Sequence, residues 1–283
     1  MSETYFFEQQ DGSRIAYNIL EPHNPEDNKK TPLILIVGCK SVKEIFMGLK
    51  EELAKNQKVI IFDNRGMGES NVVSPYDPIS IDLMAQDTIA LVKHLGFKRF
   101  NLLGWSMGGR IALHVASDIP SELELEKLII CSSSTRPPTT SYFENLYNLP
   151  KPPDPPKNIQ GLKDEIMKIF EKFEKYFVDY MIQHPDVFDK FAEIQFKSNC
   201  PFEIFKRQWE AIKKADTLSK LKAIKVPTLL IHGEADQVNS IKESEVIARE
   251  IANSKFIPIP KVGHMFWFGA TESINFINEF LSN

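Results

Sequence analysis

Cysteine is scarce in this chain, and the cysteines that occur lie far apart. Cys39, Cys131 and Cys200 form no CxxC pair among the 283 residues. Disulfide frameworks and zinc knuckles both need cysteines at short, paired spacings, so this arrangement argues against them. We interpret the three side chains as buried free thiols, which persist in a reducing compartment, and we therefore expect a cytoplasmic protein.

Long apolar runs and a surplus of positive charge are missing as well. No segment reaches the about 18 to 20 apolar residues of a membrane-spanning helix. The first residues do not join a basic segment to an apolar one as a secretory signal does, so we expect no stable membrane insertion. Lys and Arg number 34 against 38 Asp and Glu. This balance argues against nucleic acid as the main partner, because phosphate binding needs a basic surplus.

Apolar strands and amphipathic helices alternate along most of the chain. A β-hairpin is predicted around Asp11-Gly12, followed by an exposed loop over residues 21–31. Apolar segments typical of buried strands lie at 32–38, 58–63, 99–104, 128–132, 227–233 and 255–260. Helices are predicted at 42–56, 80–95, 107–117, 240–251 and 272–281. This order predicts an α/β fold with a mostly parallel, doubly wound sheet and helices on both faces.

The alternation is interrupted between residues 132 and 223. Seven of the 18 prolines lie between residues 136 and 156, which excludes a central strand or helix interior there. Nine of the 20 phenylalanines lie between residues 141 and 205. One apolar stripe with helical spacing contains Leu162, Ile166, Ile169, Phe170, Phe173 and Phe177. We interpret 132–223 as a helical insertion in a core formed by 1–131 and 224–283, and its phenylalanines mainly as packing residues.

The motif that carries chemistry is Gly104-Trp105-Ser106-Met107-Gly108, at the junction of a predicted strand and helix. G-x-S-x-G in this context is typical of a nucleophile elbow, a tight turn that lifts the serine above the edge of the sheet. Its glycines let strand and helix approach closely. Ser106 is therefore the candidate nucleophile. The backbone N–H of Met107, at the helix N-terminus, is a candidate donor to an oxyanion.

A serine nucleophile needs a base, and the base needs an orienting acid. After this type of elbow the acid precedes the histidine in the chain. We choose His264, in a loop after the last predicted strand, and interpret His232 as a structural histidine. For the acid we choose Asp236; Glu234 is the alternative, and a solvated loop carboxylate is the structural explanation for either.

The loop after residues 32–38 is expected to supply the second oxyanion donor. The backbone N–H of Cys39 is the candidate, and Gly38 would permit a close approach of the backbone. Cys39 could also be a second nucleophile, but no histidine lies near it in the sequence. The phenylalanines of the insertion are expected to form an apolar pocket together with Trp105, Phe266 and Trp267. We predict Gly38, Trp105, Phe266 and Trp267 as substrate-binding residues.

With these motifs the chain resembles the α/β-hydrolase family over nearly its whole length. Residues 63–70, DNRGMGES, are similar to the D-x-R-G-x-G-x-S loop of many members, and the resemblance implies that 132–223 is a cap domain. The family includes esterases, enol-lactonases, C–C hydrolases and cofactor-free haloperoxidase-like proteins. Most relatives have His-Gly where this chain has Val37-Gly38. A serine nucleophile argues against the dehalogenase and epoxide-hydrolase branches, and the lack of HGGG argues against the lipase branch built on that loop.

We therefore expect a serine hydrolase that cleaves a small, uncharged and fairly hydrophobic ester or lactone through an acyl-enzyme. No metal and no organic cofactor is implied, and a monomer or homodimer is expected. A C–C bond hydrolase of a diketone would use the same three residues, and a ligand-binding receptor would keep the fold with little turnover. The lysines and phenylalanines of the insertion are interspersed with acidic residues, which favours a solvated face over a membrane surface.

Overall fold

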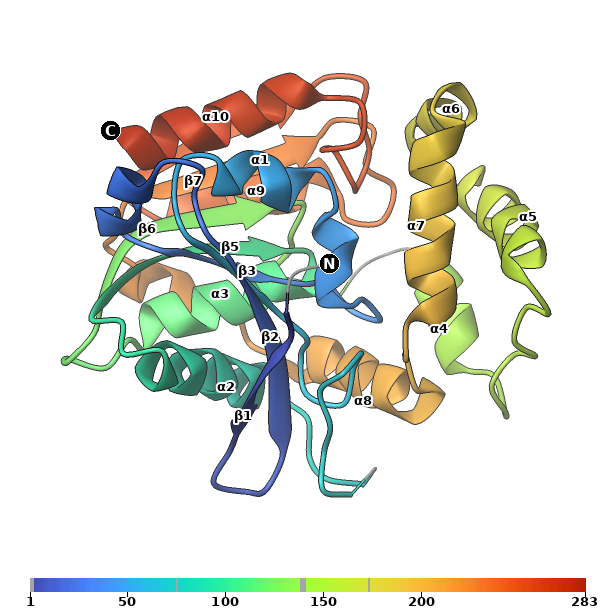
Figure 1. Ribbon diagram of the computed structural model, residues 1–283, viewed down its shortest axis with the longest axis horizontal. Coiled ribbons are helices and arrows are strands. Elements are labelled where there is room, and N and C mark those ends of the chain that lie inside the picture. Colours follow the sequence, from blue (N-terminus) through green and yellow to red (C-terminus); the bar gives the residue numbers. More distant parts are fainter. Residues whose placement is uncertain (1–2, 75, 138–140, 173) are drawn as a thin grey trace.

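The computed structural model describes residues 3–74, 76–137, 141–172 and 174–283 (Figure 1). Its centre is an eight-stranded sheet in the order β1-β2-β4-β3-β5-β6-β7-β8. The strands are β1 (Tyr5–Glu8), β2 (Arg14–Leu20), β3 (Leu33–Ile36), β4 (Val59–Phe62), β5 (Arg99–Trp105), β6 (Glu124–Cys131), β7 (Thr228–Gly233) and β8 (Ser254–Ile259). The β1–β2 hairpin is antiparallel and joins β4 in antiparallel register, whereas β4, β3 and the remaining strands run parallel. The predicted fold class is confirmed.

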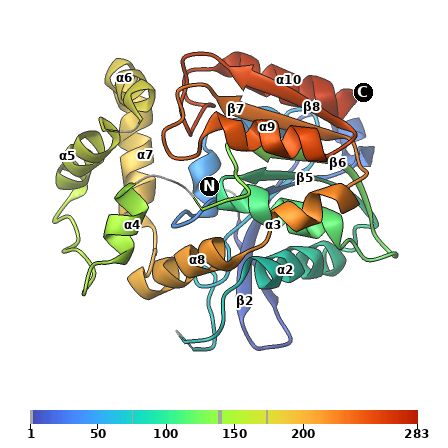
Figure 2. The same ribbon diagram turned by 180° about the vertical axis from the view of Figure 1, so that it is seen from behind.

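Helices cover both faces of this sheet. Along β3, Ile34 and Ile36 point to one hydrophobic cluster and Leu33 and Leu35 to another, as the period of two in a strand requires. The first cluster includes side chains of α2 (Ile81–His94), α3 (Met107–Ser117) and α9 (Ile241–Glu250). The second includes α1 (Leu49–Ala54) and α10 (Thr271–Ser282). Figure 2 views the molecule from the side on which α9 and α3 lie in front of the strands.

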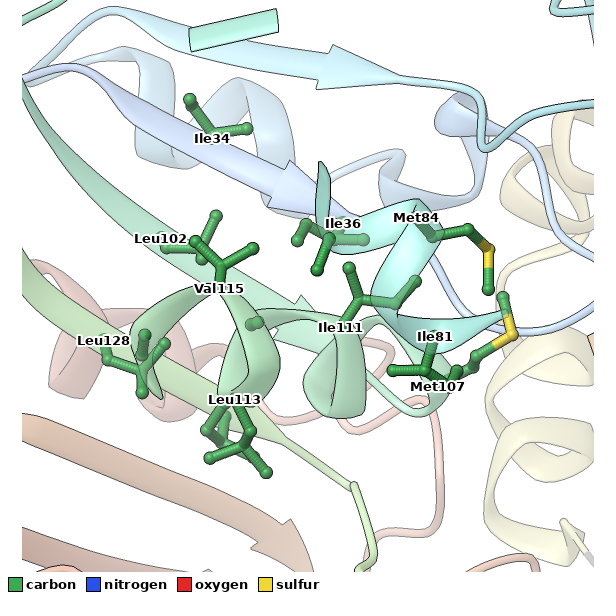
Figure 3. Packing of buried hydrophobic residues seen from close by; sticks show 14 of the residues in the cluster. Ile34, Ile36, Ile81, Met84, Leu102, Met107, Ile111, Leu113, Val115 and Leu128 are labelled. Carbon is green, nitrogen blue, oxygen red and sulfur yellow. The ribbon is translucent and has the colours of Figure 1, made fainter. Parts of the chain in front are cut away.

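The start, the buried face and the end of helix α2 each follow from particular residues. Ser80 caps its first turn by accepting a 3.0 Å hydrogen bond from the backbone N–H of Leu83. Figure 3 shows Ile81 and Met84 meeting Met107 of α3 in the core. The helix is followed by Gly96, whose φ of 72° is a conformation that glycine tolerates best.

The helix predicted over residues 42–56 is wrong as a single element. The structure has a 3-10 helix, η2 (Lys43–Phe46), and the short α1, separated by Gly48 with a φ of 83°. A left-handed residue cannot continue a right-handed helix, so the chain turns there and buries apolar residues on both sides of the break. A second 3-10 helix, η1 (Pro25–Lys29), lies within the predicted loop 21–31.

The segment 132–223, which we call the inserted segment, connects β6 to β7. It contains α4 (Ser141–Tyr147), α5 (Ile159–Phe170), α6 (Lys175–Gln183), α7 (Pro185–Lys197), α8 (Phe202–Lys214) and η3 (Leu218–Ala223). Figure 1 shows α5, α6 and α7 beside the sheet and α8 closer to α2 and β2. Phe177 packs against Phe191 and Phe268, so these phenylalanines are packing residues as expected. Phe173 of the predicted stripe lies outside the described residues.

Candidate active site

Ser106 lies at the sharp turn between β5 and α3. Its φ of 58° and ψ of −120° are strained for a residue with a side chain, a conformation that costs about 1–3 kcal/mol and is found mainly at functional sites. The neighbouring glycines explain how the turn fits. At Gly104, an added Cβ would lie 2.2 Å from the carbonyl oxygen of Gly108. At Gly108, an added Cβ would lie 2.1 Å from the carbonyl oxygen of Ile36. Strand and helix can therefore meet only where these positions have no side chain.

A cavity of about 10 Å³ opens beside Ser106. It is lined by Cys39, Ser106, Met107, Arg110, Ser134, Phe143, Trp209, Ile212, Val238 and Asn239. Both residues predicted to donate to an oxyanion, Cys39 and Met107, thus border the same space as the predicted nucleophile. Gly38 permits this approach, because an added Cβ would lie 3.1 Å from the Cβ of Ser106.

Asp236 and His264 form a buried pair. The Nδ1 of His264 lies 2.8 Å from Oδ2 of Asp236, and the side chains are 8% and 0% exposed. The Oδ1 of Asp236 accepts hydrogen bonds from the backbone N–H groups of Val238, at 2.8 Å, and Asn239, at 2.9 Å. Burial alone would raise the pKa of Asp236, but the charges of His264 and His232 and the hydrogen bonds from their rings hold that pKa well below its usual range. Asp236 is therefore a carboxylate at neutral pH.

The loop of His264 is attached to the elbow through Trp105. The indole N–H of Trp105 donates a 3.0 Å hydrogen bond to the backbone carbonyl oxygen of His264, and the two rings lie 5.1 Å apart. Because Trp105 directly precedes Ser106, this bond holds the main chain of His264 against the residue next to the candidate nucleophile. The structure thereby brings Ser106, Asp236 and His264 to one end of the sheet, where β5, β7 and β8 finish.

A family model described as "alpha/beta hydrolase fold" matches residues 31–270. The chain belongs to the alpha/beta hydrolase fold family. It is 28% identical over 258 residues to AB hydrolase superfamily protein YisY of Bacillus subtilis, covering 89% of this chain and 91% of that protein.

Two solved structures share the fold of this alpha/beta hydrolase. The enol-lactonase from Burkholderia xenovorans superposes with a TM-score of 0.79 at 20% identity, covering 99% of this chain and 100% of that chain. The esterase from Exiguobacterium antarcticum superposes with a TM-score of 0.77 at 21% identity and the same coverage. The resemblance inferred from the motifs is thus confirmed.

The alternative histidine and the alternative acid of this hydrolase lie in different surroundings. His232 is fully buried, and its ring nitrogens contact the hydroxyl of Ser244, the carbonyl oxygen of Asn239 and Oδ2 of Asp236. Its Nε2 lies 3.0 Å from that carboxylate oxygen, so His232 and His264 contact the same oxygen of Asp236. Glu234 is exposed, whereas Asp236 is buried. These positions favour Asp236 as the partner of His264.

The four predicted substrate-binding residues lie outside the described lining of the cavity beside Ser106, and their contact with substrate stays a prediction. Phe266 and Trp267 are 0% and 5% exposed and belong to a hydrophobic cluster, because their loop folds back against Phe46 and Trp105 instead of lining the cavity. Trp105 holds the main chain of His264, and Gly38 provides space next to Ser106. Both aromatic residues of the cavity lining, Phe143 and Trp209, come from the inserted segment, which also supplies Ile212.

Arg110 adds a cation to a cavity that was expected to be apolar. It is 1% exposed and donates hydrogen bonds to the hydroxyl of Ser134 and the carbonyl oxygen of Ile212. Burial lowers the pKa of Arg110 to about 10. The sequence interpretation missed this residue, although its position four residues after Ser106, one helical turn into α3, could have indicated it.

The loop that contains Cys39 is fixed from two directions. The side-chain oxygen of Gln208, in α8, accepts a 2.9 Å hydrogen bond from the backbone N–H of Lys40, which has a φ of 55°. Asn64, in the DNRGMGES loop, donates a 3.2 Å hydrogen bond to the carbonyl oxygen of Val37. Burial raises the pKa of the Cys39 thiol to about 12, which disfavours a thiolate nucleophile at this position.

The DNRGMGES loop itself is held by buried ion pairs. Asp63 contacts Lys43 through both the ammonium, at 2.9 Å, and the backbone N–H, at 2.7 Å. Arg65 binds Asp87 through two nitrogens and Asp11 through a third. At Gly68, with a φ of 56°, an added Cβ would lie 2.4 Å from a carboxylate oxygen of Asp63. The motif therefore shapes the backbone next to the site.

In residues 3–74, 76–137, 141–172 and 174–283, no helix combines the length and the apolar character needed to cross a bilayer. In the same ranges, no cluster of three or more His, Cys, Asp and Glu side chains is arranged to hold a metal ion.

Proposed function

We propose that this chain is a serine hydrolase that cleaves a carboxylic ester or lactone through an acyl-enzyme. The observation that carries the proposal is the buried 2.8 Å contact between Asp236 and His264 on a loop bonded to the strained Ser106 elbow. A packing turn needs neither a buried carboxylate–imidazole pair nor a strained serine beside a cavity. Together these features match what nucleophilic catalysis by serine requires.

The reaction begins with proton transfer from Ser106 Oγ to Nε2 of His264. The Oγ atom forms a bond to the carbonyl carbon of the substrate, and the backbone N–H groups of Cys39 and Met107 stabilise the oxyanion. The C–O bond to the leaving group then breaks, and His264 returns its proton to the departing alkoxide. Water, deprotonated by the same imidazole, then attacks the acyl carbon. The bond between that carbon and Ser106 Oγ breaks, His264 returns the proton to Oγ, and the acid is released.

Asp236 contributes by keeping His264 in one tautomer. Its carboxylate accepts the Nδ1–H, which leaves Nε2 free to take the serine proton. Because the pKa of Asp236 is held low, the group stays negative while the imidazole becomes positive. The positive charge therefore forms next to a fixed negative charge in a buried site, where this interaction is stronger than in water.

The inserted segment is proposed to act as a cap that shapes the substrate pocket. It supplies Phe143, Trp209 and Ile212 to the cavity wall, which favours a hydrophobic acyl group. At about 10 Å³, the cavity offers room for about one water molecule beside Ser106. The two structural neighbours, an enol-lactonase and an esterase, support the choice of ester and lactone substrates.

A fluorophosphonate probe and a substrate panel test this proposal. We expect the probe to label the wild-type protein and not Ser106→Ala, and we expect turnover of p-nitrophenyl esters or lactones that depends on Ser106. The panel should contain neutral and carboxylate-bearing esters, because Arg110 borders the cavity. Turnover of a vinylogous diketone in preference to all esters would indicate a C–C hydrolase. A wild-type protein that is neither labelled nor active would favour a ligand-binding role.

A further inference from the structure

A buried carboxyl group from the inserted segment lies against the loop of His264. Glu174 directly precedes α6, and only 2% of its surface is exposed. Its Oε1 accepts a 2.5 Å hydrogen bond from the backbone N–H of His264. At Gly263, an added Cβ would lie 2.1 Å from Oε2 of Glu174. The carboxyl group thus rests directly on the glycine that precedes the histidine.

The same histidine is held from the opposite side by the core. Trp105 donates to the carbonyl oxygen of His264, while Glu174 accepts from its N–H. Both polar groups of the His264 main chain are therefore bonded, one to the strand that leads to Ser106 and one to the inserted segment. A main chain fixed at both groups limits the directions in which the imidazole can point.

The charge of Glu174 fits this arrangement. Burial raises the pKa of Glu174 to about 8; nearby His264 opposes the rise and Asp236 adds to it. Within the described residues, Oε2 has no hydrogen-bond partner. A neutral carboxylic acid can accept the N–H through its carbonyl oxygen without placing a second full negative charge beside Asp236.

We propose that Glu174 is a positioning residue, which fixes the main chain of His264 and so couples the placement of the inserted segment to that of the catalytic base. Glu174 does not touch the reacting atoms and acts only through the peptide of residues 263 and 264. The inference rests on the proposed catalytic role of His264, but the contact itself exists whether or not the chain is a hydrolase.

Kinetics of Glu174→Leu and Glu174→Gln test the catalytic part of this proposal. With p-nitrophenyl butyrate at pH 7, we expect Glu174→Leu to lower kcat by about tenfold or more with little change in KM, because the imidazole is no longer held in place. Glu174→Gln retains an acceptor oxygen and is uncharged, so its kcat should stay close to the wild-type value. Glu171→Leu, a substitution at an exposed glutamate three residues earlier, is the matched control.

Amide hydrogen exchange tests the contact without reference to turnover. The backbone amide of His264, followed by NMR or in peptides covering residues 262–266, should exchange faster in Glu174→Leu. It should remain protected in Glu174→Gln and Glu171→Leu. If Glu174→Leu does not fold, Gly263→Ala provides a second variant, because its added Cβ pushes the same carboxyl group away.

The two measurements separate failure of the inference from failure of the proposed function. An active wild type whose Glu174→Leu variant keeps kcat overturns the inference and leaves the hydrolase function standing. A wild type without activity or labelling overturns the hydrolase function. The exchange experiment then still decides whether Glu174 holds the backbone N–H of His264. Equal exchange at His264 in wild type and a folded Glu174→Leu overturns the inference in either case.

Discussion

Asp236 receives more contacts than an exposed loop carboxylate. One of its oxygens accepts two backbone N–H groups, and the other faces ring nitrogens of His264 and His232. The turn that follows β7 therefore orients the carboxylate before any substrate arrives. Such preorganisation lets the group stabilise an imidazolium without rearranging during the reaction.

Replacing Asp236 with asparagine should remove the negative charge beside His264 and change the tautomer of its imidazole. In Asp236→Asn the amide would donate to Nδ1 of His264 and favour the tautomer that cannot accept the serine proton. We expect kcat for a p-nitrophenyl ester to fall by about 10³ to 10⁴-fold with a small change in KM. Glu234→Gln, which alters an exposed acid two residues away, should have no such effect. A kcat close to wild type in Asp236→Asn would show that this pair is structural.

Glu174 should also make folding stability depend on pH. Its pKa is raised in the folded state from 4.5 to about 8, so the folded protein binds more protons than the unfolded chain between these values. The free energy of unfolding contributed by this group therefore falls as pH rises from about 4.5 towards 8. Urea unfolding of wild type and Glu174→Gln should show the variant gaining relative stability over this range. A constant difference between the two would contradict burial of the neutral acid.

Sequence motifs selected the candidate catalytic residues and missed the residues that contact them. Ser106, Asp236 and His264 could be selected because residue type, order and strand ends were all visible. Glu174 is separated from His264 by 90 positions in the chain, and no spacing rule relates them. Phe266 and Trp267 were predicted to bind substrate because they are aromatic, and the structure buries both in a hydrophobic cluster, which residue type alone does not indicate.

At the scale of elements, the break between η2 and α1 depends on one backbone angle. Apolar spacing continues through residues 42–56, so periodicity alone predicts one helix. Gly48 has open space around it and a φ of 83°, which shows that conformation and not crowding requires glycine there. The elements that were predicted correctly, such as α2 and α3, have a cap or a motif that marks their ends.

Substituting alanine at two glycines should change the free energy of unfolding in opposite directions. Gly48→Ala places a side chain in a left-handed conformation and should lower the free energy of unfolding by about 1–2 kcal/mol. Gly161→Ala lies within α5, where the added Cβ makes only an ordinary contact at 3.5 Å, and should raise that free energy by about 0.5–1 kcal/mol. Thermal and urea unfolding of both variants check the two signs. Equal effects would show that backbone conformation does not distinguish these sites.

At the scale of the whole molecule, the inserted segment belongs to the hydrophobic interior. Phe205, Trp209 and Ile212 of α8 pack in the cluster that contains α2 and α3. Phe177 and Phe191 of α6 and α7 pack in the cluster on the other face. The sequence predicted an insertion from the interrupted alternation, but not that it would pack into both clusters, because the partners of an amphipathic helix are set by tertiary contacts.

Removing most of the inserted segment should therefore destabilise the sheet. A chain in which residues 137–216 are replaced by a short Gly/Ser linker would expose apolar surface of both clusters to water. We expect it to aggregate or to lose cooperative thermal unfolding, measured by circular dichroism and light scattering. A soluble, cooperatively folding product would show that the remaining 1–136 and 217–283 form an independent domain.

The strand order also leaves β8 at one edge of the sheet. Edge strands with free N–H groups can pair with strands of another molecule and start aggregation. Pro258 lies within β8 and has no N–H, and Lys255 adds a charge to the same strand. The outer edge of β8 therefore offers an interrupted set of donors, which protects the protein against growth into intermolecular sheets.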